Sequence, residues 1–512
     1  MTDFEDQTGP AVTRGTVTRG EVARGAGLAG LSRAGAFIEA LAQPLYIWMF
    51  GLAAYGIYVV LWGVINLLTN ILDLSMTSAL QRIVPTRARE EQVHGALKLA
   101  LLITIIPSLI VASLVALNAD QIATFFSAAP QDQSRLPGAI TLFVWALPLW
   151  TFIEVATSAA RARRAFGPEI RIRILWEQLA RLLFALGFFF LGFGSEGLML
   201  AHLCSLFIVA LLCLPLLARY YDLKLLVRAP LNWPQARELV GSGVALLPAN
   251  LARRMLIDAP PLAINVMLPG SAGASAAGLF EVGRKLSTVP YIVRQSFQYV
   301  LAPLSSAQAH ADRRQIAPLY HFASRVSTAL VVPLAGLMIF TGPDVLSVYR
   351  EEAQAALPIL AILSVARALE AIVGPAGTIV EMIGHRALPL LNSIIAVIAW
   401  IALALWLTPT QGAFGMAIAV STAIILSTYA AALELGISDR LWPFDRKLLQ
   451  ALAIASVGIG AMALVEYLTG GPIRFASNMA IWAITSWFTL RYGLTREDRL
   501  AFGRLSRQLR LV

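Results

Sequence analysis

Hydrophobic stretches long enough to cross a membrane recur along almost the whole chain, from residue 28 to residue 493. A helix rises 1.5 Å per residue, so about 20 apolar residues cross the roughly 30 Å hydrocarbon core of a bilayer. Lipid offers no partner to unpaired backbone groups, which restricts spanning structures to helices and closed barrels. The sequence lacks the alternating ten-residue pattern of an outer-membrane barrel. We therefore predict an all-α, polytopic membrane protein.

Composition agrees with this prediction. Of the 512 residues, 58% are hydrophobic and 14% charged, with a mean hydropathy of +0.70, whereas a soluble domain carries about 25% charged residues. Cys204 and Cys213 lie in one apolar segment without a CxxC pair or a histidine cluster, so we expect no disulfide, metal site or cofactor. Residues 1–27 have no apolar signal-peptide region and are predicted to form a disordered cytoplasmic tail.

The distribution of basic residues predicts the topology. Of the 40 Lys and Arg residues, only Arg135, Arg350 and Arg474 fall in alternate loops, and eight lie within the spans. The others gather at the opposite side, so we expect both termini in the cytoplasm of a bacterial inner-membrane protein. The net charge of +10 then follows from topology and anionic lipids, not from nucleic-acid binding. Fourteen spans are predicted, at about 28–50, 54–79, 95–118, 137–160, 172–193, 197–218, 239–268, 274–303, 318–341, 353–384, 387–408, 411–436, 448–468 and 473–492.

An internal repeat suggests two lobes. Residues 51–67 and 274–290 share an A-x-G-[IL]-aromatic-x-V pattern at an offset of 222 residues. Both copies follow an outward-facing loop, which indicates parallel repeats related by an axis along the membrane normal. We expect an N-lobe at 28–219, a C-lobe at 237–436, two extra helices at 447–493 and a basic tail at 494–512. The tail is equally compatible with an amphipathic surface helix and with an ordinary span flank.

The same two regions carry a resemblance to a known family. GLAAYGIYVVLWGVINLLTNILDLSMTSALQRIVP (51–85) and AAGLFEVGRKLSTVPYIVRQSFQYVLAPLSSAQAHADR (276–313) resemble bacterial polysaccharide flippases of the multidrug, oligosaccharidyl-lipid and polysaccharide exporter superfamily. The resemblance implies a V-shaped, two-lobed transporter that moves lipid-linked oligosaccharides by alternating access through a central cationic cavity. The seventh span of such proteins often carries an Asp-Arg pair near its outer end. Here the order is Arg253, Arg254, Asp258, a departure from that pattern.

Charges inside the predicted spans point to candidate site residues. A charge facing lipid at the bilayer centre costs about 2.5–3.5 kcal/mol, so these residues must face partners or water. Helical spacing allows four pairs, Glu177–Arg181, Arg254–Asp258, Glu281–Lys285 and Arg367–Glu370.

Near several of these positions bases outnumber acids, which favours a wet, cationic cavity. The candidate substrate-binding residues are Arg253, Arg254, Arg284, Lys285, Arg294, Arg181, Arg367, Tyr291, Asn66 and Asn70. The candidates for a coupling ion are Glu39, Asp73 and Glu154. Kinks near Pro260 and Gly374 could act as hinges or reflect ordinary helix curvature.

These features favour a flippase for undecaprenyl-pyrophosphate-linked oligosaccharide in O-antigen, capsule or exopolysaccharide assembly. The expected partners are the lipid-linked oligosaccharide, membrane lipids, and polymerase or other polysaccharide-assembly proteins. The alternatives are a cation-coupled drug or metabolite exporter and a lipid II flippase. A membrane polymerase or glycosyltransferase is disfavoured because the longest outward loop, about 119–136, is too short to hold an enzymatic domain. We therefore expect a transporter and not an enzyme.

Overall fold

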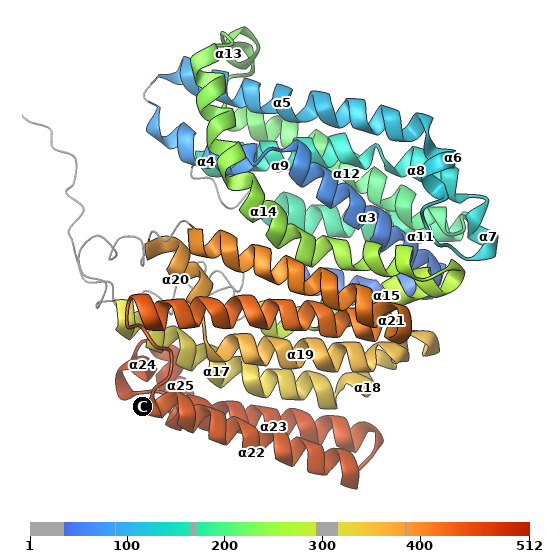
Figure 1. The fold of residues 1–512 in the computed structure, drawn as a ribbon. Coiled ribbons are helices and arrows are strands. Elements are labelled where there is room, and N and C mark those ends of the chain that lie inside the picture. The colour runs from blue at the N-terminus through green and yellow to red at the C-terminus, as the bar shows by residue number, and fades with distance from the viewer. Residues whose placement is uncertain (1–34, 88, 164–169, 293–315, 384–386, 512) are drawn as a thin grey trace, which may run out of the picture.

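The chain folds into a bundle of helices arranged in two lobes (Figure 1). The computed structural model describes residues 35–87, 89–163, 170–292, 316–383 and 387–511, and these residues form helices and turns without a strand. The predicted all-α, multispanning fold is confirmed. The lobe boundaries predicted from the repeat stay predictions.

The first lobe contains the following elements, with connecting turns. They are α2 (Gly35–Phe50), α3 (Leu52–Leu72), α4 (Met76–Ile83), η1 (Val84–Thr86), α5 (Glu90–Leu117), α6 (Ala119–Ala123), α7 (Pro130–Gln133), α8 (Leu136–Phe143), α9 (Ala146–Ala162), the π-helical segment η2 (Ile170–Trp176), α11 (Glu177–Phe190) and α12 (Glu196–Tyr220). The short α13 (Leu223–Arg228) follows.

The second lobe and the C-terminal part continue the helical pattern. Their elements are α14 (Trp233–Met267), α15 (Gly270–Leu286), α17 (Ile316–Phe340), α18 (Gly342–Leu346), η4 (Glu351–Ala356), α19 (Leu357–Ile372), α20 (Ala376–Ile383), α21 (Ala387–Ser438), α22 (Arg446–Leu468), α23 (Gly471–Tyr492), α24 (Arg496–Leu500) and α25 (Arg504–Gln508).

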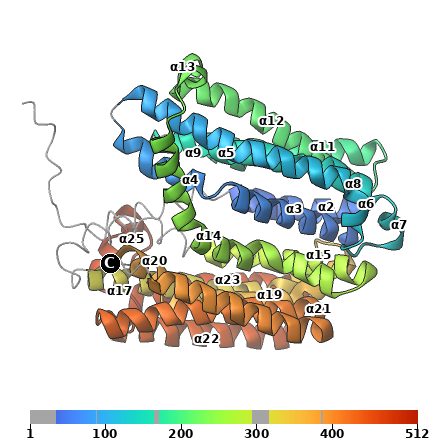
Figure 2. The same cartoon turned by 45° about the horizontal axis from the view of Figure 1, so that its top comes forward.

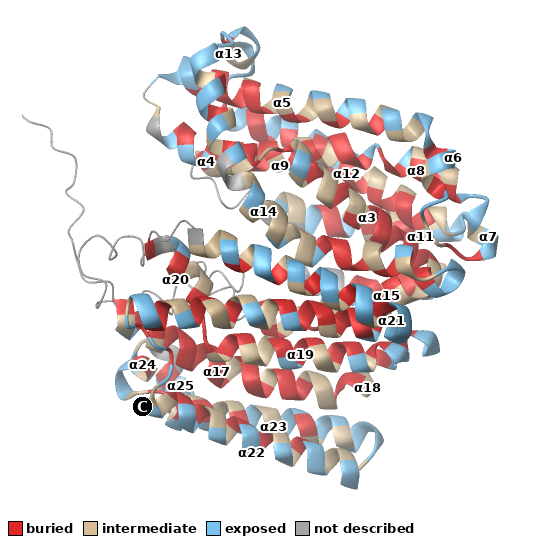
Figure 3. Cartoon of the chain, in the orientation of Figure 1, coloured by how far each residue is buried: buried red, intermediate tan, exposed pale blue. Residues whose placement is uncertain are grey.

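Each predicted span has a helical counterpart in chain order. By length and apolar composition, eight helical stretches within the described residues qualify as membrane spans. The longest, Leu388–Ser438, bends at Gly412, where φ is 59° and ψ is −136°, so it supplies two of the predicted passes. Many large apolar side chains are exposed, as lipid contact requires; among them Leu117, Phe190 and Tyr467 are 82%, 81% and 87% exposed. Figure 3 shows how buried and exposed residues are distributed over the helices.

Two predicted spans are interrupted. The span at 54–79 was predicted as one helix, which is wrong, because Leu74 and Ser75 adopt positive φ values of 47° and 57° and separate α3 from α4. Neither residue is a glycine or proline, so the sequence gives no local signal for this break. The second break, between α19 and α20, lies at Gly374 with a φ of 62°, where a kink was expected. Pro260, by contrast, lies inside the continuous helix α14.

The bundle has two distinct ends. The segments α6, α7 and α18 lie at one end, here called the α7 end; α4, α13 and α20 lie at the other, the α13 end (Figure 1, Figure 2). Arg135 lies between α7 and α8, Arg350 between α18 and η4, and Arg474 near the start of α23. These are the three basic residues that the topology prediction assigns to outward loops.

Hydrogen bonds join the lobes at the α7 end. Asn265 of α14 is fully buried, and its Nδ2 donates to the Ser127 carbonyl oxygen at 2.7 Å while its Oδ1 accepts the Ser127 amide at 3.0 Å. The buried Tyr349 hydroxyl donates to the Gln43 Oε1 at 3.1 Å. Because both contacts cross from one lobe to the other, they hold the lobes together at this end.

The C-terminal tail folds back onto the protein. Arg325 of α17 is buried and bridges the Asp498 carboxylate of α24 and the Asp445 carboxylate that caps α22, the latter at 3.0 Å. The Trp487 Nε1 donates to the Leu509 carbonyl oxygen at 2.9 Å. The tail therefore packs on the helix ends and does not extend away as a free basic segment.

Candidate transport site

Helix α14 carries two adjacent arginines in its middle. Arg253 is exposed, and its Nη2 donates to the Asn250 Oδ1 at 3.3 Å. The Arg254 Nη1 lies 3.7 Å from the Asp258 Oδ2, and 41% of the Arg254 side chain is exposed. An exposed guanidinium at this depth is stable only where it meets water, since acyl chains would impose a cost of several kcal/mol. The arginines therefore indicate a wet face on α14.

Helix α15 adds a second charged group. The Arg284 Nε and Nη2 donate to the two carboxylate oxygens of Glu281, each at 2.7 Å, while the Lys285 Nζ lies 3.8 Å from the same carboxylate. The predicted Glu281–Lys285 pair exists but is the weaker one. The forked guanidinium matches both oxygens at once, which an ammonium cannot do.

Together these two helices concentrate positive charge. Between residues 250 and 286 they hold four bases, Arg253, Arg254, Arg284 and Lys285, and two acids, Asp258 and Glu281. Asp258 is close enough to Arg254 and Arg284 to interact with both electrostatically. The two carboxylates partly neutralise the bases and leave a net surplus of two positive charges, the chemistry expected of an anion-binding site.

Helix α14 places this charge beside the first lobe. Arg254 interacts electrostatically with Asp73, next to the end of α3, and with Glu154 of α9. The Asn250 Nδ2 donates to the Ser75 hydroxyl at 3.1 Å, at the break between α3 and α4. The candidate site therefore spans the boundary between the lobes.

The candidates for a coupling ion differ in their surroundings. The Glu154 carboxylate binds the Arg173 Nη2 at 2.7 Å, and the Arg173 guanidinium lies over the Trp150 ring at 4.5 Å. Asp73 is buried and accepts a hydrogen bond from the Thr77 hydroxyl at 2.8 Å. A carboxylate with a neutral partner keeps more capacity for a proton or cation than one paired with arginine. Asp73 is therefore the stronger of these two candidates, and the side chain of Glu39 lies outside the described residues.

Arg181 is part of the core of the first lobe and is only 5% exposed. Its Nε and Nη2 donate to the Glu177 Oε1 at 3.0 and 2.6 Å, and its Nη1 donates to the Tyr58 hydroxyl at 2.8 Å. The Tyr58 hydroxyl also lies 3.0 Å from the His202 Nδ1. The predicted Glu177–Arg181 pair is present, and its members are buried together in the first lobe.

Arg367 and Tyr291 form a separate contact in the second lobe. The Arg367 Nη1 donates to the Glu370 Oε2 at 2.6 Å, as the spacing predicted, and its guanidinium lies 4.3 Å from the centre of the Tyr291 ring. Only 17% of the Arg367 side chain is exposed. Its charge is largely satisfied within the protein, so a substrate role would need a rearrangement.

The amide candidates lie on α3. Asn66 is buried, and the Asn70 Nδ2 donates to the Asn66 carbonyl oxygen at 2.8 Å. Arg294 lies outside the described residues, so its prediction is not tested. Within the described ranges no group of three His, Cys, Asp or Glu residues is arranged to hold a metal ion.

Comparison with known proteins identifies a family and a shared fold. Residues 49–352 match a family described as polysaccharide biosynthesis protein. No curated protein sequence matches the chain. The fold is similar to that of the lipid II flippase MurJ in an inward closed conformation, with a TM-score of 0.72, 11% identity and coverage of 90% of this chain and 97% of that one.

Two further solved structures share the fold. One is a MOP superfamily transporter from Pyrococcus furiosus, with a TM-score of 0.61, 14% identity and coverage of 83% of this chain and 97% of that one. The other is the Vibrio cholerae MATE transporter VcmN in the bent form, with a TM-score of 0.57, 12% identity and coverage of 86% and 99%. At these identities the likeness concerns the fold.

Proposed function

Because the chain belongs to the polysaccharide biosynthesis protein family, we propose that it is a flippase for undecaprenyl-pyrophosphate-linked oligosaccharide repeat units. It would move them across the bacterial inner membrane for O-antigen, capsule or exopolysaccharide assembly. Its helical transporter fold favours transport over catalysis. The observation that carries the proposal is the surplus of basic side chains over acidic ones on α14 and α15.

The chemistry of the cargo matches that surplus. The pyrophosphate that joins the lipid to the sugar is negatively charged and rich in acceptor oxygens, and guanidinium groups bind such oxygens in a bidentate manner. Arg253 and Arg254 are the accessible cations of the site, with Arg284 held nearby by Glu281. A site that spans both lobes can release its ligand when the lobes move, as alternating access requires.

The arrangement of the ends supports the direction of transport. The loops at the α13 end carry most of the basic residues, so in our proposal this end faces the cytoplasm and both termini lie on that side. Hydrogen bonds between the lobes close the opposite end. Cargo made in the cytoplasm would reach Arg253 from the α13 end before the α7 end opens.

Lipid II flipping is the second candidate, favoured by the similarity to MurJ. Lipid II presents the same kind of lipid-linked pyrophosphate, so the cationic site does not separate the two cargoes. Rescue of cells depleted of their own lipid II flippase would favour this second candidate, and failure to rescue combined with restored polymer export would favour the first.

The proposal is tested by complementation of a strain that lacks this transporter. Arg253→Ala and Arg254→Ala should abolish surface polymer while membrane abundance stays normal. Arg82→Ala is the matched control, because Arg82 is an exposed arginine in the last turn of α4, outside the site. If polymer is lost only in proportion to protein abundance, these arginines are structural and the proposed binding role is wrong.

A further inference from the structure

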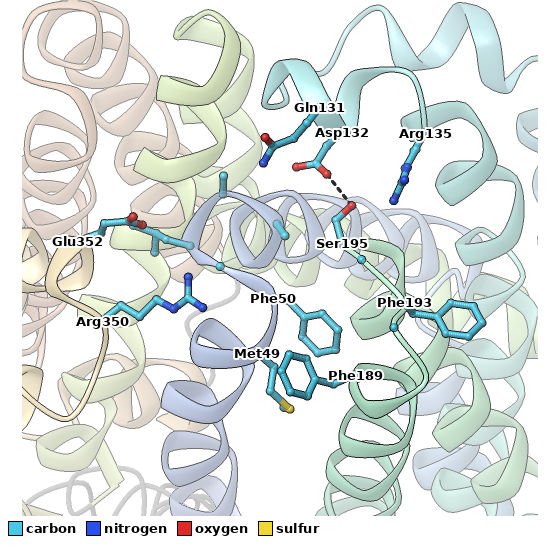
Figure 4. A pocket seen from close by; sticks show the side chains of 16 residues that line it. Met49, Phe50, Gln131, Asp132, Arg135, Phe189, Phe193, Ser195, Arg350 and Glu352 are labelled. Atoms are coloured by element: carbon cyan, nitrogen blue, oxygen red, sulfur yellow. Dashed lines mark hydrogen bonds between the residues drawn. The ribbon is translucent and has the colours of Figure 1, made fainter.

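A pocket lies at the α7 end, and none of the charged residues of α14 and α15 lines it. It has a volume of about 670 Å³, and Figure 4 shows the side chains that line it. Volumes of about 300–1,000 Å³ are typical of sites for small ligands. The pocket is therefore large enough to hold one or more sugar residues.

Both lobes contribute to this pocket. Arg350 and Glu352 come from the second lobe, at the start of η4, while Phe50, Arg135 and Phe189 come from the first. Figure 4 shows Arg350 reaching toward the pocket from one side and Arg135 standing on the other. The site is complete only while the lobes meet at this end.

The two arginines are unusual for their location. The positive-inside rule depletes basic residues from outward loops, and only three are found there, Arg135, Arg350 and Arg474. Arg474 is neutralised by Asp344 at 2.7 Å and Glu466 at 3.0 Å. The other two both line the pocket, and within the described part of the chain neither forms an ion pair. The Asp132 and Glu352 carboxylates also line the pocket, and Arg350 donates one N–H to the Trp48 carbonyl oxygen. The remaining N–H donors of the two guanidinium groups are open to an anionic ligand.

The floor of the pocket is aromatic. The Phe50 and Phe189 rings meet edge to face with centroids 6.1 Å apart, and Phe189 is 40% exposed (Figure 4). Exposed aromatic rings offer an apolar surface to the C–H face of a sugar ring. Asp132, which accepts the Ser195 hydroxyl at 2.8 Å, and Gln131 supply polar groups for sugar hydroxyls.

We propose that this pocket binds an anionic saccharide at the outer face, with Arg135 and Arg350 contacting its carboxylate or phosphate group and Phe189 packing against the sugar ring. This inference rests on the proposed function, since it takes the exported glycan as the ligand. Bound saccharide bridges the lobes and adds to the Arg350–Trp48 hydrogen bond of 2.5 Å, which already crosses between them. Exported glycan would thus hold the outer end closed and slow further export.

The test measures binding of trigalacturonic acid to the purified full-length protein in nanodiscs of neutral lipid. Arg350→Gln and Arg135→Gln should each weaken binding about tenfold, as the loss of one charge-assisted hydrogen bond predicts. Phe189→Ala should weaken the binding of the acidic trisaccharide and also that of its carboxyl-reduced form. Arg474→Gln is the matched control, because it removes an arginine at the same end but outside the pocket, and it should bind like the wild type.

Three results would overturn this assignment. The first is that the wild type does not bind trigalacturonic acid, and the second is that the two pocket variants bind it as well as the wild type does. The third is that binding is lost when phosphatidylglycerol is added to the nanodiscs, which would make a lipid headgroup the occupant. Arg253→Ala separates this inference from the proposed function, since it should abolish export and leave trigalacturonic acid binding unchanged. Retained binding with unaltered export in Arg253→Ala would refute the cationic transport site and not the outer pocket.

Discussion

Gly56 and Gly278 pack against each other where the two lobes meet. A Cβ placed on Gly278 would lie 3.4 Å from the Gly56 Cα and 2.9 Å from the Leu52 carbonyl oxygen. A Cβ on Gly56 would lie 1.8 Å from the carbonyl oxygen of Ala274. Gly56 and Gly278 occupy the same position of the internal repeat, as do Leu52 and Ala274. The two glycines therefore meet equivalent backbone groups of the facing helices.

Replacing either glycine should destabilise the protein. Gly56→Ala forces the α3–α15 crossing apart, because the added methyl group would overlap a backbone oxygen that cannot rotate away. We expect a loss of about 1–3 kcal/mol or more, the range for overpacking, measured as a lower unfolding temperature in detergent. Gly241→Ala is the control, since nothing lies within 4 Å of its added Cβ. Equal unfolding temperatures for Gly56→Ala and the wild type would contradict the close crossing.

The buried ion pair of the first lobe should be structural. Glu177→Gln leaves the Arg181 guanidinium buried without its carboxylate, and breaking such a pair costs about 3–5 kcal/mol. Membrane abundance of Glu177→Gln should fall, and the protein that remains should export polymer at the normal rate per molecule. Glu91→Gln, at an exposed position on α5, serves as the control. Normal abundance with loss of export would assign Arg181 to transport after all.

The hydrogen bonds at the α7 end should hold that end closed. Asn265→Ala removes two hydrogen bonds to the Ser127 backbone, each worth about 0.5–1.5 kcal/mol. The population with an open outer end should rise, and an impermeant thiol reagent should label a cysteine introduced at position 54 more rapidly than in the parent with intact Asn265. Both proteins carry serine in place of Cys204 and Cys213. Unchanged labelling would mean that other contacts keep this end closed.

The stability of the turn after α12 should decrease at acidic pH. The Asp222 side chain accepts the Leu225 and Lys224 amides, and these hydrogen bonds lower its pKa from the ordinary value of 3.8. A lowered pKa means that the carboxylate stabilises the turn above pH 3.8 and that this contribution is lost as the pH falls through the lower, folded-state value. The protection factors of residues 223–228, which are corrected for the slower intrinsic exchange in acid, should therefore fall as the pH drops below 3.8. Asp222→Asn, which keeps a capping oxygen, should remove that dependence; the same acid response in this variant would argue against Asp222 as its source.

The sequence predicts those features that depend on local spacing. Hydropathy predicted the helical fold and the spans. The i,i+3 and i,i+4 spacings predicted the ion pairs of Arg367 with Glu370 and of Arg181 with Glu177. Two residues one turn apart on a helix meet whatever the rest of the fold does. The repeat pattern at Gly56 and Gly278 was likewise visible as a sequence motif.

Features that depend on tertiary contacts could not be predicted in this way. The hydrogen bond between Tyr58 and Arg181 joins residues 123 positions apart, so no local sequence pattern indicates it. The outer pocket joins residues as distant as Phe50 and Glu352. The break at Leu74 also escaped prediction, because tertiary packing against α14 stabilises it; a Cβ on Gly243 would lie 2.2 Å from the Leu74 carbonyl oxygen. Only the assembled bundle brings these groups together.

The most direct test of the central claim is a flipping assay in proteoliposomes with a short-chain polyprenyl-pyrophosphate disaccharide as cargo. The cationic site on α14 predicts that the Arg253→Gln, Arg254→Gln double variant loses at least tenfold in flipping rate, a change of about 1.4 kcal/mol, at an unchanged unfolding temperature. It also predicts that a polyprenol without phosphate is not transported by the wild type. Full flipping by the double variant, or equal transport of the uncharged lipid, would contradict binding of the pyrophosphate by these arginines.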